Sequence, residues 1–256
     1  MIDIHIHVLP GVDDGPPDLA SAVEMCRIAA DDGCRVLVAT PHQRHDLWEN
    51  RDRALLERRL AELRAEVAGI IEIRLGGEIR VDSELIDELR TPDRRGLLPL
   101  CSGPYVLLEL PRHGAVVDPV SLAHELRVSG WRPILAHPEL ISALVDDEPL
   151  VASLHRMGVL FQITGDSLLG RFGRTARRTC EEWLDAGRVH FVASDGHSPL
   201  RRRPGLSAAR QALVSGWGED VAEALTAINP LAVVEGRPLP SRGARELRLA
   251  VIEGDR

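Results

Sequence analysis

Ile2–Val8 reads IDIHIHV, a short run in which apolar and polar side chains alternate. Alternation with a period of two is typical of a β-strand, and it places His5 and His7 on the same face. In residues 19–30 the apolar side chains recur at intervals of three and four, as on one face of a surface helix. The chain therefore opens with a strand that presents two imidazoles side by side, followed by a helix.

The alternation of strand and helix continues along the chain. Asp18 is expected to cap the first helix and Gly33 to end it. Six further apolar runs are predicted as strands, at Cys34–Thr40, Ile70–Gly76, Tyr105–Leu110, Arg132–His137, Val159–Thr164 and Val189–Ser194. Further helices are predicted at Asp46–Ala68, Ser83–Arg90, Pro119–Ser129, Pro149–Met157, Thr175–Ala186, Leu206–Ser215 and Asp220–Ile228. Apolar strands separated by helices predict a parallel sheet of the α/β class, covered on both faces.

A parallel sheet of this length either stays open and doubly wound or closes into a barrel. No Gly-x-Gly-x-x-Gly motif follows the first strand, as it commonly does in open dinucleotide-binding sheets. This absence and the number of strands favour a closed β/α barrel. We expect one domain over residues 1–256, in which the arginine-rich tail after about residue 240 is peripheral.

The composition limits the classes of function. The 256 residues include 31 Arg, no Lys and 39 acidic residues, which gives a net charge of −8. Without lysine the chain can form neither a Schiff base nor a P-loop, and its negative charge argues against nucleic acid as a partner. The four Cys are far apart, and none has the Arg six positions on that a cysteine-dependent phosphatase needs. No basic leader or long apolar run is present, so we expect a cytoplasmic protein without membrane insertion.

Imidazoles and carboxylates gather at the ends of the predicted strands. Six of the seven strands end in or are followed by such groups: His5 and His7, His42, Glu78, Glu109, His137, and Asp195 with His197. In a parallel barrel these ends share one face, where the functional site lies. A single histidine could be a hydrogen-bonded core residue, but several buried carboxylates together are unfavourable without a cation. Nitrogen and carboxylate donors together suit Mn, Fe or Zn.

The motifs HxH, TPH, GGE, LLEL, AHPE and SDGH, in this order, resemble those of the PHP (polymerase and histidinol phosphatase) superfamily. The longer stretches HIHVLPGVDDGPPDLASAVEM and VHFVASDGHSPLRRRPGL are similar to one branch, the CpsB/CapC-type manganese-dependent protein-tyrosine phosphatases of bacterial capsule and exopolysaccharide loci. The resemblance implies a distorted (β/α)7 barrel with up to three Mn²⁺ ions, with Fe or Zn as alternatives. It also implies hydrolysis of phosphotyrosine on a tyrosine kinase of polysaccharide assembly.

The same resemblance implies the metal ligands. The first ion is assigned to His5, His7, Glu78 and Asp195. Glu78 bridges to the second ion, which Glu109 and His137 complete. The third ion is assigned to Asp14, His42 and His197. Only the DDG pattern favours Asp14 over its neighbour Asp13.

Arginine is the expected partner of the phosphate oxygens, because its planar fork binds them bidentately. Members of the branch usually carry an Arg directly after HPE, where this chain has Leu140. A second Arg usually precedes the Pro downstream of SD-x-H, which favours Arg203, with Arg202 as the next candidate. Arg171 could replace the missing guanidinium.

Two other functions are compatible with this pattern. The chain could be another PHP phosphoesterase, of the histidinol-phosphate type or a general phosphomonoesterase. It could also be a regulator that binds phosphotyrosine but turns over poorly, because Leu140 lacks a guanidinium. Oligomerisation is possible in each case.

The double substitution His5→Ala with His7→Ala tests the predicted metal ligands. It should remove one metal ion and nearly all hydrolysis while the fold persists, because both imidazoles face the same ion. Metal content and phosphatase rate are the measurements, with circular dichroism as the check on folding. Wild-type rates in this variant would refute the assignment.

Overall fold

The structure is a computed structural model that describes residues 1–111 and 118–240, so the tail after residue 240 lies outside it. The strands are β1 (Ile2–Ile6), β2 (Val36–Ala39), β3 (His42–Gln43), β4 (Glu72–Leu75), β5 (Glu78–Arg80), β6 (Tyr105–Glu109), β7 (Arg132–Ala136), β8 (Leu160–Thr164) and β9 (Val189–Ala193). The α-helices are α1 (Leu19–Asp31), α2 (Arg53–Glu66), α3 (Leu85–Arg90), α4 (Pro119–Val128), α5 (Ser142–Val145), α6 (Glu148–Arg156), α7 (Gly165–Leu168), α8 (Arg174–Asp185), α9 (Ser207–Trp217), α10 (Glu219–Glu223) and α11 (Asn229–Val234). Shorter helical turns are η1 (Arg94–Gly96), η2 (Leu100–Ser102), η3 (Pro138–Leu140) and η4 (Ala224–Ile228).

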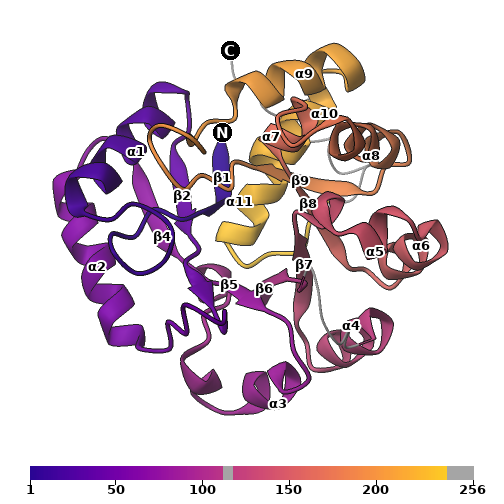
Figure 1. Cartoon of the computed structure of the whole chain (residues 1–256), viewed down its shortest axis with the longest axis horizontal. Helices are drawn as coiled ribbons and strands as arrows, with labels where there is room; N and C mark the ends of the chain where they lie inside the picture. Colours follow the sequence, from indigo (N-terminus) through magenta and orange to yellow (C-terminus); the bar gives the residue numbers. More distant parts are fainter. Residues whose placement is uncertain (112–117, 241–256) are drawn as a thin grey trace.

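The strands form the wall of a barrel, with most of the helices outside it (Figure 1). Parallel pairing gives two sheets among the described residues, in the orders β1-β2-β4 and β3-β5-β6-β7-β8-β9. The sheets are continuous, because β2 leads into β3 and β4 leads into β5 after two intervening residues each. On the other side, the Asp195 amide donates to the His5 carbonyl (2.8 Å) and the His7 amide to the Gly196 carbonyl (2.9 Å). The predicted distorted (β/α)7 barrel is therefore confirmed.

All seven predicted strands are present, with ends that shift by up to two residues. The short strands β3 and β5 were not predicted, because glycine and proline interrupt the runs that precede them. The interruption before β5 has a steric cause. A Cβ on Gly77 would lie 2.3 Å from the side-chain oxygen of Gln43, which already accepts from the Leu98 amide. Only glycine lets the strand pass this buried amide group.

The predicted helix at Asp46–Ala68 begins too early. The observed helix, α2, begins at Arg53, where Asp52 caps it by accepting from the Leu55 amide (3.1 Å). Residues 44–52 form a loop instead. Asn50 has a φ of 43° there, and its side-chain amide donates to the carbonyls of His42 (2.8 Å) and Val12 (3.0 Å). These bonds hold the loop across the strand ends.

The other predicted helices are present, and the first shows both expected end signals. Asp18 caps α1 by accepting from the Ser21 amide (2.8 Å), and Gly33 adopts a φ of 94° just beyond its end. The short helices α5, α7 and α11 were not predicted, since each has too few residues to show a helical period.

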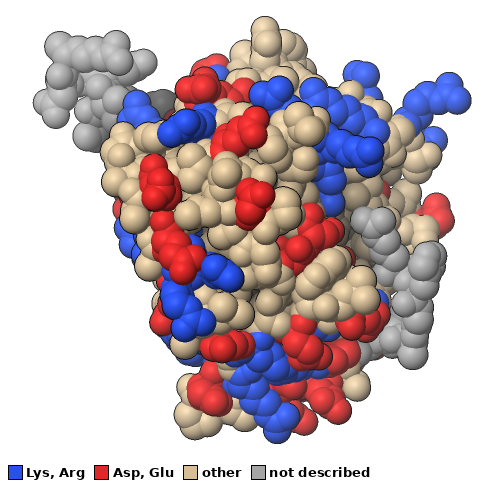
Figure 2. Space-filling view, turned by 60° about the vertical axis from the view of Figure 1, so that its left-hand side comes forward, with Lys and Arg blue, Asp and Glu red and all other residues tan. Residues whose placement is uncertain are grey.

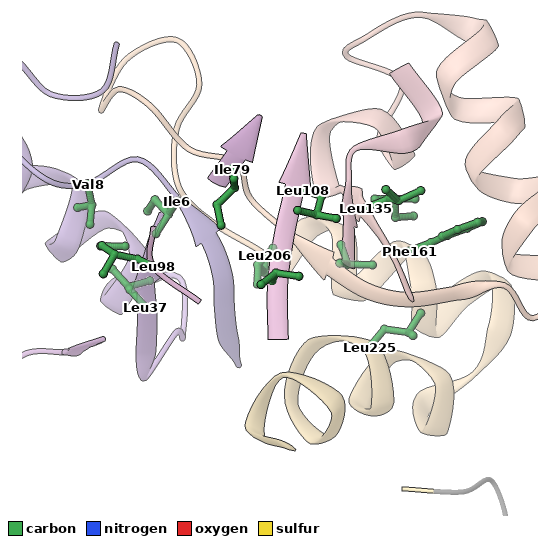
Figure 3. Close-up of a cluster of buried hydrophobic side chains, with 14 of the residues drawn as sticks. Ile6, Val8, Leu37, Ile79, Leu98, Leu108, Leu135, Phe161, Leu206 and Leu225 are labelled. Carbon is green, nitrogen blue, oxygen red and sulfur yellow. The ribbon is translucent and has the colours of Figure 1, made fainter. Parts of the chain in front are cut away.

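Two apolar clusters lie on the two sides of the barrel wall. One fills the barrel interior and includes Ile4, Leu107, Ile134 and Phe191, together with Val233 from α11. The other packs the outer face of the strands against the helices. Its members include side chains from β6, β7 and β8, which Figure 3 shows as Leu108, Leu135 and Phe161. Because the strands alternate, both clusters are built from consecutive residues of the same strands.

The first strand contains a β-bulge. From Asp3 to Ile6 it advances three residues while its partner β2 advances two. A bulge changes the face to which the following side chains point. Ile4 accordingly lies in the interior cluster and Ile6 in the outer cluster, whereas His5 and His7 point to the interior above Ile4. The bulge thus turns both imidazoles toward the mouth of the barrel.

The surface carries mixed charge. Acidic and basic side chains are interspersed on the face drawn in Figure 2. On α2 such residues form the ion pairs Arg53–Glu57 (2.7 Å) and Arg59–Glu62 (3.0 Å). This face offers no continuous basic track of the kind that nucleic acids bind. Among the described helices, none is long and apolar enough to cross a membrane.

Asp32→Ala should destabilise the barrel. Asp32 follows α1 and accepts from the Ser207 amide (2.8 Å) at the start of α9, so it caps that helix from a distant part of the chain. Loss of the cap should lower the free energy of unfolding by about 1–2 kcal/mol, measured by chemical denaturation. Asp31→Ala, at the exposed neighbouring residue, is the matched control. Equal stability of the two variants would contradict this role of Asp32.

Candidate metal centre

The structure brings all nine predicted ligands together at the mouth of the barrel. They form four overlapping groups whose candidate ligand atoms lie within 4.8 Å of one another. The groups are His7, Asp14, His42 and His197; His5, His137 and Asp195; His5, His7 and Glu78; and His42, Glu78 and Glu109. Asp14 comes from the loop after β1, and the others lie near the C-terminal end of a strand of the barrel wall. His42 and Glu78 do so as the first residues of β3 and β5, which continue β2 and β4.

Two of these residues depend on an unusual backbone conformation. His137 follows β7 with a φ of 35°, and Asp195 follows β9 with a φ of 52°. This left-handed region is disfavoured for residues other than glycine and typically costs about 1–3 kcal/mol per residue. Here it turns both side chains from the strand ends toward the barrel axis.

Glu78 lies at the centre of the cluster and is fully buried. Its Oε1 is 2.9 Å from His137 Nε2 and 3.4 Å from His5 Nε2. Its Oε2 is 2.9 Å from His42 Nδ1 and 3.3 Å from His7 Nε2. One carboxylate therefore contacts four imidazoles, the geometry expected of a residue that bridges metal ions.

The geometry separates Asp13 from Asp14. The Asp14 side chain faces the cluster, and its Oδ1 lies 3.3 Å from His197 Nε2 and 3.5 Å from His42 Nε2. Asp13 is turned away. Its side chain accepts from His7 Nδ1 (2.8 Å) and from the amides of His42 and Gly15 (both 3.0 Å). Asp14 is thus positioned to offer a ligand atom to the cluster, whereas Asp13 orients His7.

Three imidazoles are held by acceptors on the side away from the cluster. His7 Nδ1 donates to Asp13, His5 Nδ1 to Gln162 Oε1 (2.7 Å), and His197 Nδ1 to the Asp195 carbonyl (2.8 Å). A proton fixed on Nδ1 leaves the lone pair of Nε2 directed at the cluster. Gln162 was not predicted as part of the site. The usable signal was its place in β8, where alternation puts it on the inner face beside Thr164.

The donor set fits divalent metal ions. His5 Nε2 and His7 Nε2 lie 3.3 Å apart, and when both rings carry their proton on Nδ1, two lone pairs face each other there. Four buried atoms of the cluster make no well-directed hydrogen bond within the described part of the chain, although His42 Nδ1 and Glu78 Oε2 are close to each other: His42 Nδ1, His137 Nδ1, Glu78 Oε2 and Glu109 Oε2. Buried acceptors that face one another are unfavourable unless a cation lies between them. Nitrogen and carboxylate donors without a thiolate suit Mn, Fe or Zn.

The electrostatic field of the cluster is strong. Burial alone would lower the pKa of His137, but the hydrogen bond and charge of Glu78 raise it to about 9. Burial would raise the pKa of Asp195, yet His5 and Arg202 lower it to about 2. The carboxylates therefore favour positive charge beside them. Without a metal ion, protons bound to the imidazoles supply that charge. A metal ion would replace those protons.

Among the predicted arginines, Arg202 faces the cluster and Arg203 does not. Arg202 forms an ion pair with Asp195 and lines the hollow above the nine ligands. Arg203, which the sequence favoured, lines a separate hollow next to Arg171. Of the two candidates, Arg202 is therefore the one positioned beside the cluster, and Arg203, which the motif of an Arg before a Pro favoured, is not.

Arg171 lies in the same separate hollow as Arg203, where it donates to Asp166 (2.6 Å). Leu140 ends η3 and is only half buried. The structure thus does not place Arg171 where it could replace a guanidinium beside the cluster.

The hollow above the cluster has a volume of about 340 Å³. Seven of the nine cluster residues (all but His5 and His7) line it together with Arg202, His45, Trp48, Arg80 and Pro111. The Trp48 ring is nearly parallel to the His42 imidazole (10°), with centroids 5.5 Å apart, and lies 4.8 Å from the His45 ring. The Trp48 and His45 rings give the hollow one flat, aromatic wall beside its charged floor. Neither ring was predicted as part of the site, because Trp48 was assigned to the helix expected at Asp46–Ala68 and His45 directly precedes that helix.

Comparison with known proteins gives a consistent result. Residues 1–235 match the family described as capsular polysaccharide synthesis, CpsB/CapC. The tyrosine-protein phosphatase YwqE of Bacillus subtilis is 32% identical over 88% of this chain and 89% of its own length. The tyrosine-protein phosphatase CpsB of Streptococcus pneumoniae is 27% identical over 91% of this chain and 98% of its own.

Solved structures agree. A chain from the crystal structures of YwqE and CpsB, described as unique metal-dependent tyrosine phosphatases, superposes with a TM-score of 0.86 at 30% identity. The match covers 94% of this chain and 96% of that one. The phosphotriesterase from Mycobacterium tuberculosis, at 10% identity and a TM-score of 0.58, shares the fold alone.

Asp13→Asn should weaken metal binding although Asp13 is not placed as a ligand. The amide removes the negative charge and one of the two acceptor oxygens of Asp13, so the bond that directs His7 Nε2 at the cluster becomes weaker. The affinity for Mn²⁺ should fall by about 10- to 100-fold, measured by calorimetry. Asp31→Asn changes the charge equally at an exposed site and is the control. The same affinity in both variants would argue against this role.

Proposed function

This chain belongs to the CpsB/CapC family, and we propose that it is a metal-dependent phosphatase that hydrolyses phosphotyrosine on proteins. The observation that carries the proposal is the set of nine nitrogen and carboxylate donors that converge below a hollow with an arginine at its edge. The names of YwqE and CpsB, both tyrosine-protein phosphatases, agree with it.

We assign the metal role to the nine clustered residues and Mn²⁺ as the native ion, with Fe and Zn as alternatives that fit the same donors. When bound, the ions would activate water and neutralise the charge of a phosphate ester. The reaction forms a bond from water oxygen to phosphorus and breaks the bond from phosphorus to the phenolic oxygen. The products are inorganic phosphate and tyrosine.

Arg202 binds the phosphate in this proposal. Its side chain is about one-third exposed (37%) and lines the hollow, while the ion pair of its guanidinium with Asp195 fixes its position. A guanidinium held in this way binds phosphate oxygens with two parallel hydrogen bonds and loses little conformational entropy in doing so.

The flat wall formed by Trp48 and His45 suits an aryl phosphate. An aromatic ring bound beside Trp48 would stack on it while its phosphate reaches the cluster. A phenolate is also a better leaving group than an alkoxide, because its pKa is close to 10. The hollow therefore favours phosphotyrosine over phosphoserine or phosphothreonine.

Cysteine chemistry does not explain hydrolysis here. Burial raises the pKa of Cys26 and of Cys101 to about 12, and it raises the pKa of Cys34 and Cys180 as well. The thiols stay protonated at neutral pH, and only a thiolate is an effective nucleophile.

The protein substrate is proposed to be a bacterial tyrosine kinase of polysaccharide assembly, and the reaction is proposed to take place in the cytoplasm. The family description, capsular polysaccharide synthesis, supports this pathway. Regulation of such a kinase requires removal of phosphate from its tyrosines, which is the reaction that the site is built to perform.

A substrate panel tests the proposal. Phenyl phosphate and a phosphotyrosine peptide should be hydrolysed with Mn²⁺ and not with EDTA, and both should be preferred over glycerol phosphate and histidinol phosphate. Trp48→Ala should raise KM for phenyl phosphate by about three- to tenfold, because aromatic stacking contributes about 0.5–1.5 kcal/mol. KM for glycerol phosphate should not change.

Leu47→Ala, at the exposed neighbour of Trp48, is the control for the loop. A preference for histidinol phosphate would favour a different phosphoesterase. Tight binding of the phosphotyrosine peptide without turnover would favour a regulator.

A further inference from the structure

Arg80 extends from the same strand as the central carboxylate. It ends β5 two residues after Glu78, so alternation directs both side chains to the inner face. Ile79, between them, packs in the outer cluster, as this alternation requires. Parallel register pairs Arg80 with Glu109 on the neighbouring strand β6. Arg80 therefore lies at the rim directly above the ligands, and it lines the same hollow as Arg202.

The fold makes little use of the charge of Arg80. Its ion pair within the described residues is with Asp46 at 3.4 Å, and the Asp46 side chain is 81% exposed. Such exposed pairs contribute little to stability. By contrast, the guanidinium of Arg44 is almost fully buried and pairs with both Asp82 and Glu88. Arg44 has a structural role, whereas Arg80 holds a partly exposed cation at the edge of a functional hollow.

Arg80 and Arg202 approach the hollow from different sides. In the strand order, β6, β7 and β8 separate β5 from β9, and Arg202 lies on the loop that follows β9. A phosphate monoester presents three strong acceptor oxygens. One guanidinium on each side of the mouth could bind two of them while the third faces the metal ligands.

We propose that Arg80 is the second phosphate-binding cation of this chain, opposite Arg202. The inference rests on the proposed function, since it assigns Arg80 to the same phosphate. Arg80 would supply the second positive charge for the phosphate, which the uncharged Leu140 cannot provide.

Arg80→Gln tests the inference, with inorganic phosphate as the probe. The Mn²⁺-loaded variant should bind phosphate about tenfold more weakly by calorimetry, and KM for phenyl phosphate should rise in parallel, because a charged hydrogen bond is lost. The phosphate affinity of Arg80→Lys should lie between those of the wild type and Arg80→Gln, since lysine keeps the charge but not the planar, bidentate guanidinium. Manganese affinity and melting temperature should match those of the wild type.

The control is Arg74→Gln, which removes a guanidinium from β4 that is half exposed and paired with Glu72. Adding Leu140→Arg should restore phosphate binding more in Arg80→Gln than in the wild type. Phosphate binding by Arg80→Gln equal to that of Arg74→Gln would overturn the inference and leave the proposed function intact. If the wild type hydrolyses no aryl phosphate but still binds phosphate through Arg80, the proposed function fails and the inference stands.

Discussion

Buried negative charge is the constraint on which the rest of this structure depends. Five carboxylates crowd one end of the barrel, those of Asp13, Asp14, Glu78, Glu109 and Asp195. Placing even one unpaired carboxylate in such a setting costs several kcal/mol, so the fold must supply matching positive charge. Five imidazoles and the Arg202 guanidinium supply part of it, and protons bound to imidazole supply more. Metal ions meet the same requirement with stronger bonds and leave the imidazoles neutral.

The backbone bears the cost of bringing these groups together. A regular barrel would direct alternate residues inward at fixed heights. Here the bulge in β1 turns His5 and His7 toward the mouth, and left-handed conformations at His137 and Asp195 turn two further ligands inward. The bulge and both left-handed residues lie at or next to the clustered imidazoles and carboxylates. Such strained backbone would not stabilise a barrel that had no functional site. Irregularity at the strand ends is therefore part of how the site is built.

Features that depend on periodicity can be predicted from the sequence, whereas features that depend on contacts between distant parts of the chain cannot. Seven of the strands and eight of the nine clustered residues could be predicted, because alternation and strand ends have a local signature, whereas Asp14 was assigned only through the resemblance to the family. The start of α2 could not be, because it depends on the bonds from Asn50 to His42 and Val12. For the same reason, motif spacing chose Arg203, whereas the path of the loop after β9 directs Arg202 to the hollow. Arg80 carried no motif at all, although its distance of two residues from Glu78 was a usable signal.

The interior of the barrel is divided into an apolar lower part and a charged upper part, and this division strengthens the site. Phe191, Ile134 and Leu107 fill the barrel below the ligands, with Val233 of α11. This apolar packing lowers the local dielectric constant beneath the cluster, so the charges there interact more strongly than they would in water. The negative field that binds cations would also repel a phosphate dianion unless metal ions and the arginines at the rim neutralised that field. Cations at the rim, outside the ligand layer, are therefore a physical requirement for admitting an anionic substrate to a site built from carboxylates.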